Sequence, residues 1–216
     1  MDKKMKKLTI DTQNHLQILT DDEFYLTGRN EKFYISIDEN VNAKIFITNA
    51  HIDTLECKIL KNSSLNLEFI SSIEKNNIST FDLEENSFLN LKIVTTKNIN
   101  EETIINLNGK NSKFQGQYLV IGKDNKNQII TRVFHKEEKT ISDISNLGIS
   151  LGNGKVRFET IGKIEKGCKK SSCQQLTRGI ILSDNSEIIS QPILLIDEFD
   201  SQANHGVAIG KITQDE

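Results

Sequence analysis

His205, which Gly206 follows near the end of the 216-residue chain, is the first candidate for chemistry. A neutral imidazole nitrogen can bind a metal such as iron, and a neighbouring glycine lets a ligand or another backbone approach closely. A single histidine near a terminus is nevertheless more often an exposed or hydrogen-bonded residue. Position alone therefore favours a surface histidine, with a metal ligand as the alternative.

The cysteines are the second candidate. Cys168 and Cys173 lie in the segment CKKSSC, and a C-x4-C pair can supply half of a zinc or iron–sulfur site. Only Cys57 and four scattered histidines remain for the other half. We therefore expect an ordinary exposed turn here. The alternative is a metal-binding enzyme that uses the three cysteines and a histidine.

No other pattern indicates catalysis. The glycine-rich segment 148–154 lacks the G-x-x-x-x-G-K-[ST] pattern of a phosphate-binding loop, and no helical pattern follows it. No Ser/His/Asp set or pair of carboxylates is recognisable either. We expect a protein that is not an enzyme.

The elements that position these residues are predicted to be strands. Leu65, Leu67 and Phe69 alternate with polar residues, and the C-terminal runs GIIL, EIIS and ILLI are separated by turn residues. Apolar spacing typical of helices is rare. The sequence therefore predicts a fold that is nearly all β.

A weak repeat points to a solenoid. The pattern Asn-Ser-x-apolar starts at Asn62, Asn86, Asn111 and Asn185, with spacings of 24, 25 and 74 residues. A fixed period of this size is typical of coils that bury their faces on one another, although asparagine and serine are abundant enough for chance repetition. We predict a single-domain parallel β-helix, with an N-terminal segment over residues 1–30 and the core over 31–216.

Composition excludes several classes. A formal net charge of −3 without a basic stripe argues against nucleic acid. No apolar run approaches the ~20 residues that cross a bilayer, and no apolar stretch follows the N-terminal lysines as in a secretory signal. Three cysteines do not form a disulfide framework. We expect a cytoplasmic protein without membrane contacts.

The C-terminal part resembles the SufB/SufD family of iron–sulfur cluster assembly proteins. The residues that carry the resemblance are Leu182-Ser183-Asp184, Pro192 with ILLI, and His205-Gly206 followed by Gly210-Lys211-Ile212. His-Gly is similar to the SufD branch, whereas the SufB branch usually has His-Glu and a cysteine about one coil earlier. The resemblance implies a right-handed β-helix and a non-catalytic scaffold subunit.

The resemblance also implies where the site lies. His205 and Gly206 would lie at the interface with a SufB-like subunit, with His205 as a ligand of a transient, shared iron–sulfur cluster. Counting back without gaps places Thr177 where the SufB branch has its cysteine, and Ala203 stands where some SufD relatives have one. We therefore expect one ligand from this chain, no cofactor in the isolated subunit, and the remaining ligands from the partner.

Pro192 and three further residues are expected to be structural. His135, with Thr140 and Ser142, resembles the family's H-x4-T-x-S segment, and its ring would be hydrogen-bonded across neighbouring coils. Phe158 and Gly162 resemble an F-x-G-x-I segment, in which the phenylalanine would be core and the glycine would fit a tight corner.

The partners follow from the same resemblance. A SufB-like subunit is the expected partner. A SufC-like ATPase is doubtful, because the family's C-terminal helical region is not recognisable before Glu216, which suggests a reduced SufD. A homodimer remains open. The alternative function is a β-solenoid binding or structural protein with no metal role; an aromatic content of 6% without tryptophan argues against a carbohydrate-binding one.

Overall fold

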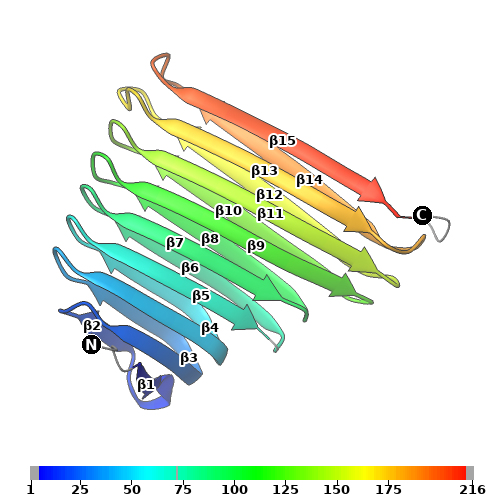
Figure 1. The fold of residues 1–216 in the computed structure, drawn as a ribbon, viewed down its shortest axis with the longest axis horizontal. Helices are drawn as coiled ribbons and strands as arrows, with labels where there is room; N and C mark the ends of the chain where they lie inside the picture. Colours follow the sequence, from blue (N-terminus) through cyan, green and yellow to red (C-terminus); the bar gives the residue numbers. More distant parts are fainter. Residues whose placement is uncertain (1–4, 72, 213–216) are drawn as a thin grey trace.

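The chain folds into a flattened column of stacked β coils (Figure 1). The computed structural model describes residues 5–71 and 73–212. Residues 1–4 of the expected N-terminal segment and residues 213–216 of the expected core therefore lie outside the described residues. The strands pair in parallel throughout the recorded ladders. The prediction of an all-β parallel β-helix is therefore confirmed.

Within the described residues, one short 3-10 helix, η1 (Ile10–Thr12), accompanies fifteen strands. The described residues contain no helix long and apolar enough to cross a membrane. The strands are β1 (Lys6–Thr9), β2 (His15–Ile18), β3 (Glu23–Ile37), β4 (Asn42–Ile59), β5 (Ser64–Ser71), β6 (Lys75–Leu83), β7 (Phe88–Thr95), β8 (Ile99–Leu107), β9 (Lys113–Lys123), β10 (Lys126–His135), β11 (Ile141–Leu151), β12 (Lys155–Ile164), β13 (Ser172–Ile181), β14 (Glu187–Ile196) and β15 (Gln202–Lys211).

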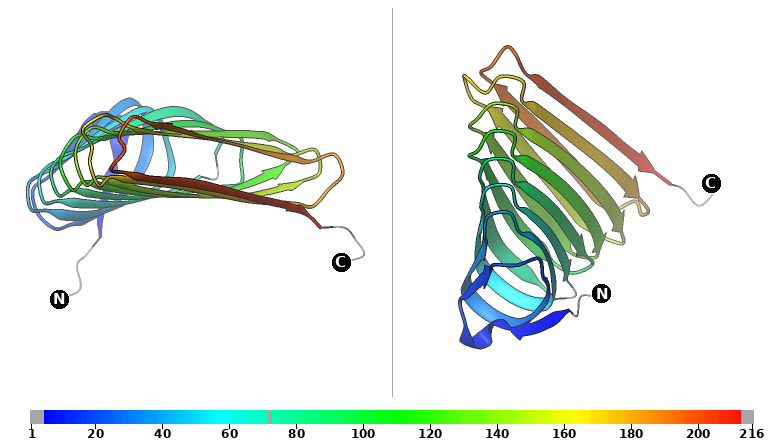
Figure 2. Two further views of the ribbon diagram at one scale, coloured as in Figure 1. Left: turned by 90° about the horizontal axis from the view of Figure 1, so that it is seen from above. Right: turned by 60° about the vertical axis from the view of Figure 1, so that its left-hand side comes forward.

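The strands form two walls. β6, β8, β10, β12 and β14 follow one another on the first wall, and β5, β7, β9, β11, β13 and β15 do so on the second wall. The long strand β4 bends from one wall to the other and joins them. Figure 2 shows the flattened cross-section from above. Each coil therefore consists of one strand from each wall.

The walls enclose a filled lumen. Residues alternate between inward and outward positions along each strand, as in the buried–partly buried alternation of β7 and β8. Because the strands pair in register, an inward residue lies above the inward residue of the previous coil. The largest side chains that fill the lumen are Tyr118, Phe33, Phe81, Phe114 and Phe158. Stacking thus hides the apolar half of every coil except the last one, at the C-terminal end of the column.

One corner of the column is built on asparagine. Asn40, Asn62, Asn86 and Asn111 adopt positive φ angles between 56° and 61°. Asparagine tolerates this left-handed conformation better than most residues. From Asn62 onward, each side chain donates a hydrogen bond to the amide oxygen of the asparagine one coil earlier, at 3.2, 2.9 and 2.9 Å. The ladder therefore supports both the turn and the stacking.

The predicted repeat holds for its first three members only. Asn185 lies between β13 and β14, at the opposite corner, and Lys139 and Lys170 take the left-handed position in later coils. The expected fixed period is wrong because the coils lengthen toward the C-terminus. Residues in register are 22 apart at Asn42 and Ser64 but 31 apart at Ile141 and Ser172.

The asparagine corner generates a stability prediction. Asn86→Ala should lower the free energy of unfolding more than Asn86→Gly, by about 1 kcal/mol, because alanine opposes the left-handed conformation while both variants lose the amide ladder. Urea unfolding of both variants measures the difference. Asn90→Ala is the matched control, because Asn90 donates to Asn66 in the same way without a positive φ. Equal losses for the alanine and glycine variants would show that backbone conformation is not the cause.

Candidate functional site

The C-terminal end of the column is open. β14 and β15 are the last strands of their walls, and no described strand pairs with their outer edges. An unpaired parallel edge presents a row of backbone N–H and C=O groups that another chain can satisfy. This end therefore offers main-chain hydrogen bonds as well as side chains.

Apolar side chains accompany these edges. In β15, Val207 and Ile209 continue the inward columns of Thr177 and Gly179, but no further coil covers them, and they are 45% and 38% exposed. Ile196 of β14 ends the inward column of Ile164 in the same way. Apolar side chains exposed along an open edge mark an interaction site more often than a solvated surface.

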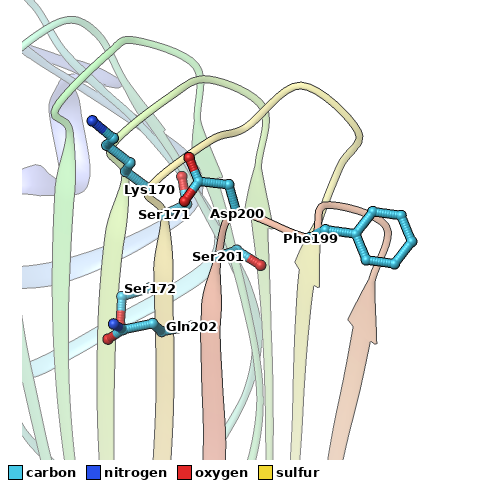
Figure 3. A pocket seen from close by; sticks show the side chains of 7 residues that line it. All are labelled: Lys170, Ser171, Ser172, Phe199, Asp200, Ser201 and Gln202. Carbon is cyan, nitrogen blue, oxygen red and sulfur yellow. The ribbon is translucent and has the colours of Figure 1, made fainter.

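The corner between β14 and β15 adds an aromatic side chain. Phe199 is fully exposed and points away from the column (Figure 3). Beside it, Lys170 and Asp200 line a hollow of about 300 Å³. The Lys170 backbone N–H donates to the Asp200 carbonyl at 2.5 Å, which fixes the last corner on the previous one. Phe199 therefore projects from a corner whose backbone is held by a hydrogen bond to the previous corner.

His205 lies in the open last coil. It is an exposed residue of β15, in register with the buried Gln175 of β13, so it continues an inward column at the end of the lumen. No described residue hydrogen-bonds its ring. Gly206, the next residue, is in register with Leu176 on the outer side. The imidazole is therefore accessible at the open end and has no partner within the described chain.

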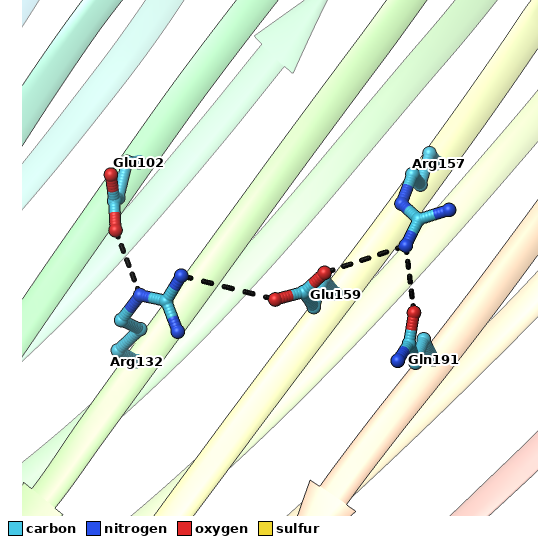
Figure 4. Close-up of polar contacts among 5 residues, drawn as sticks. All are labelled: Glu102, Arg132, Arg157, Glu159 and Gln191. Carbon is cyan, nitrogen blue, oxygen red and sulfur yellow. Dashed lines mark hydrogen bonds and ion pairs between the residues drawn. The ribbon is translucent and has the colours of Figure 1, made fainter.

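An ionic network holds β14 in place (Figure 4). Arg132 of β10 pairs with Glu102 at 2.7 Å and with Glu159 at 3.9 Å, and Arg157 pairs with Glu159 at 3.5 Å and donates to Gln191 of β14 at 2.7 Å. Such half-exposed pairs each contribute modestly, but this one links four successive strands of the first wall.

Pro192 also fits the edge position of β14. Proline has no N–H for a ladder and is confined largely to edge strands. It lies in register with Thr160, within the strand. The last strand of the first wall is therefore a place where the fold tolerates proline.

His135 is completely buried and lies inside its own coil. Its ring contacts the hydroxyls of Thr140 at 2.8 Å and Ser142 at 2.9 Å. Because the Thr140 hydroxyl donates to the Glu137 carbonyl, it accepts from Nδ1–H, and Nε2 then accepts from Ser142. These bonds join β10 to β11 of one coil, so the expectation of bonds across neighbouring coils is wrong. Burial lowers the pKa of His135 to about 4, which keeps the ring neutral.

The C-x4-C segment does form a turn, with Lys169 and Lys170 exposed, but its cysteines are not exposed. Cys168 and Cys173 are buried and pack with Ile164 in a small apolar cluster near the open end. The Cys168 thiol donates to the His135 carbonyl at 3.2 Å. The Cys173 sulfur faces inward because Cys173 occupies an inward position of β13.

Phe158 and Gly162 lie on β12. Phe158 is 1% exposed and points into the lumen. Gly162 lies within the strand and not at a tight corner, so that expectation is wrong. A Cβ at Gly162 would lie 2.3 Å from the Cys173 sulfur. Glycine is needed there because of this close approach across the lumen.

The third cysteine lies elsewhere. Cys57 belongs to β4 and stacks between Ile35 and Phe81. In residues 5–71 and 73–212, no three or more His, Cys, Asp or Glu side chains are arranged to hold a metal ion. The alternative of an enzyme with a metal centre of three cysteines and a histidine therefore has no geometric support in this part of the chain.

Sequence reasoning missed several residues of the open end. The sequence does not indicate which apolar residues are left uncovered at the end of the column. An apolar residue of the last coil, such as Phe199, Ile196 or Val207, has the same sequence pattern as one in a covered coil. Apolar residues on both faces of ILLI were the available signal, since a covered strand of this column alternates.

Comparisons with known proteins find similarity to iron–sulfur cluster assembly proteins. A family model described as "SUF system FeS cluster assembly, SufBD core domain" matches residues 18–216. The chain is also similar to the iron–sulfur cluster assembly protein SufD of Bacillus subtilis (strain 168), with 30% identity over 95 residues. This alignment covers 44% of the chain and 22% of the relative, so the match spans about a fifth of the relative's length.

Burial of His135 predicts a pH dependence of stability. Its pKa is about 4 when folded and 6.5 when unperturbed, so the unfolded chain binds more protons between these values. The free energy of unfolding should therefore fall by about 2 kcal/mol from pH 7 to pH 5 through this group. Urea unfolding of His135→Gln should lack this part of the pH dependence. His15→Gln, at an exposed histidine, should retain it; an equally steep dependence in both variants would contradict the assignment.

Proposed function

Because the chain belongs to the SufBD core family of the SUF iron–sulfur cluster assembly system, we propose that it is a non-catalytic scaffold subunit that pairs with a SufB-like subunit through its C-terminal coil. The observation that carries the proposal is the open end of the column. The free edges of β14 and β15, a set of exposed apolar side chains and an exposed imidazole lie together in its last strands.

Pairing would complete the last coil. A second subunit would satisfy the free backbone groups of β15 and cover Val207 and Ile209, which no described residue covers. Main-chain bonds give affinity in strand addition, and inserted side chains such as Phe199 give specificity. The resemblance to SufD supports a SufB-like partner, because the residues that carry it include this coil.

His205 would then lie in the interface. A neutral imidazole is a suitable ligand for iron. Thr177, in register with Val207, carries a hydroxyl and no thiolate, so the SufB-like subunit would supply thiolates. The cluster is cargo in this proposal: it forms in the complex, is shared by both subunits and leaves with a recipient protein.

The remaining parts of the proposal follow from the SUF assignment. The subunit would work in the cytoplasm and catalyse no reaction itself. A SufC-like ATPase and a second copy of this chain are the alternative partners, and co-purification with SufB-like and SufC-like proteins separates them. No nucleic acid or membrane takes part.

The proposal predicts a specific effect of His205→Ala. In a complex reconstituted with a SufB-like subunit, this variant should assemble normally and yield less iron–sulfur cluster, because one ligand is missing. Iron and sulfide content and visible absorption measure the yield. The circular dichroism of the isolated variant should be unchanged, because the side chain is exposed in the last strand.

His15→Ala is the control, since His15 is exposed at the other end of the column. It should leave the cluster yield unchanged. Failure of the wild-type chain to bind the SufB-like subunit would contradict the pairing. A normal cluster yield with His205→Ala in an intact complex would contradict the ligand role.

A further inference from the structure

A group of polar side chains lies inside the lumen, in the middle coils of the column. Glu101 and Thr103 of β8 occupy inward positions and are 1% and 0% exposed. The Glu101 carboxylate accepts hydrogen bonds from the Ser79 hydroxyl of β6 at 2.9 Å and from the Thr103 hydroxyl at 3.4 Å. Asn77, in register with Glu101, donates to the Ser79 hydroxyl at 3.2 Å. Among the buried side chains of the described residues, Glu101 is the one carboxylic acid.

Two further hydroxyls reach the same place. Thr131 of β10 is in register with Thr103, and Tyr118 lies on β9 of the opposite wall; they are 0% and 2% exposed. Burial raises the pKa of the Tyr118 phenol, the Thr131 and Thr103 hydroxyls act in the opposite direction, and the charge of Glu101 raises it further. These influences place the phenol beside both threonines and near the carboxylate.

Three oxygen atoms of this group have no hydrogen-bond partner of good geometry among the described residues. They are Oδ1 of Asn77, the hydroxyl of Tyr118 and the hydroxyl of Thr131. All three side chains are buried, so the atoms are not exposed to bulk water. A buried polar atom without a partner is costly, and oxygen atoms that come from both walls of one lumen indicate a ligand between them.

We propose that Glu101, Thr131 and Tyr118, together with Asn77 and Thr103, form a binding site for a monovalent alkali cation, Na⁺ or K⁺, inside the lumen. The donor atoms are all oxygens, which suit hard cations and not thiophilic ones. One carboxylate matches a single positive charge, whereas calcium sites usually combine several carboxylates.

The carboxylate decides between the possible ligands. It opposes an anion, while the hydroxyls and the amide oxygen can accept a cation as readily as a hydrogen-bond donor. Buried carboxylates are generally paired with or coordinate a cation, which favours an ion over a water molecule. The cation would contact strands of both walls and so hold the middle coils together. This site is remote from the open end and does not rest on the proposed function.

Enclosure links cation binding to folding. The donor atoms come from β6, β8, β9 and β10, so they come together only in the folded column. A ligand that binds only the folded chain shifts the unfolding equilibrium in proportion to its free concentration, once that concentration exceeds the dissociation constant. The unfolding equilibrium therefore reports on the site without requiring an entry path.

Urea unfolding of the chain at constant ionic strength, with NaCl or KCl replaced stepwise by tetramethylammonium chloride, tests the site. We expect the unfolding equilibrium constant to fall about tenfold for each tenfold increase in Na⁺ or K⁺ above the dissociation constant. Tetramethylammonium is too large for the lumen and should have no such effect. Equal unfolding midpoints in all three salts would overturn the proposal and leave buried water as the ligand.

Thr131→Val tests the donor atoms with a side chain of nearly the same shape. Its unfolding should require at least about tenfold more Na⁺ or K⁺ for the same stabilisation, and Glu101→Gln should abolish the cation dependence. Thr160→Val is the matched control: Thr160 is buried and in register with Thr131, but its hydroxyl accepts from Asn146 at 3.1 Å. It should keep the wild-type cation dependence. An unchanged dependence in Thr131→Val, or its loss in Thr160→Val, would overturn the assignment.

Discussion

Parallel stacking imposes the constraint on which the rest of this structure depends. Each strand receives its backbone hydrogen bonds from the coil before it and the coil after it, and each inward side chain is covered in the same way. The last coil has only one neighbour. Its edges and its inward residues are therefore left open by the same geometry that satisfies every other coil.

The open end combines features that come from different parts of the fold. Val207 and Ile209 occupy inward positions that no further coil covers. Phe199 belongs to a corner that is hydrogen-bonded to the previous coil. His205 continues the column of Gln175, which is why the imidazole faces the end of the lumen. The arginine–glutamate network keeps β14 in register (Figure 4). One surface thus presents backbone groups, apolar side chains and an imidazole together.

Much of this could be predicted from the sequence. Alternation at Leu65, Leu67 and Phe69 indicated strands, the first asparagines indicated coils, and the C-terminal residues indicated the family, all of which are confirmed. The roles of His205, Gly206 and Pro192 stay predictions. Coil length could not be predicted, because a corner absorbs extra residues without changing the strand pattern. That is why Asn185 was assigned to the wrong corner.

The inward orientation of the cysteines was missed for a related reason. Orientation depends on the register of β13, and one residue of shift reverses every side chain. The stacking of Cys173 beneath Ala203 requires a spacing of 30 residues, whereas the early repeats suggested 24 or 25. Gly162 was expected at a corner because turn glycines are common; its actual cause is the Cys173 sulfur across the lumen.

The central claim is that a second subunit completes the unfinished coil. Amide hydrogen exchange of the chain, alone and in complex with a SufB-like subunit, tests it most directly. The account predicts slower exchange on the free edges of β14 and β15 and unchanged exchange in β1, β2 and β3 at the other end. Protection at β1–β3 in a complex whose β14 and β15 exchange as in the free chain would contradict it.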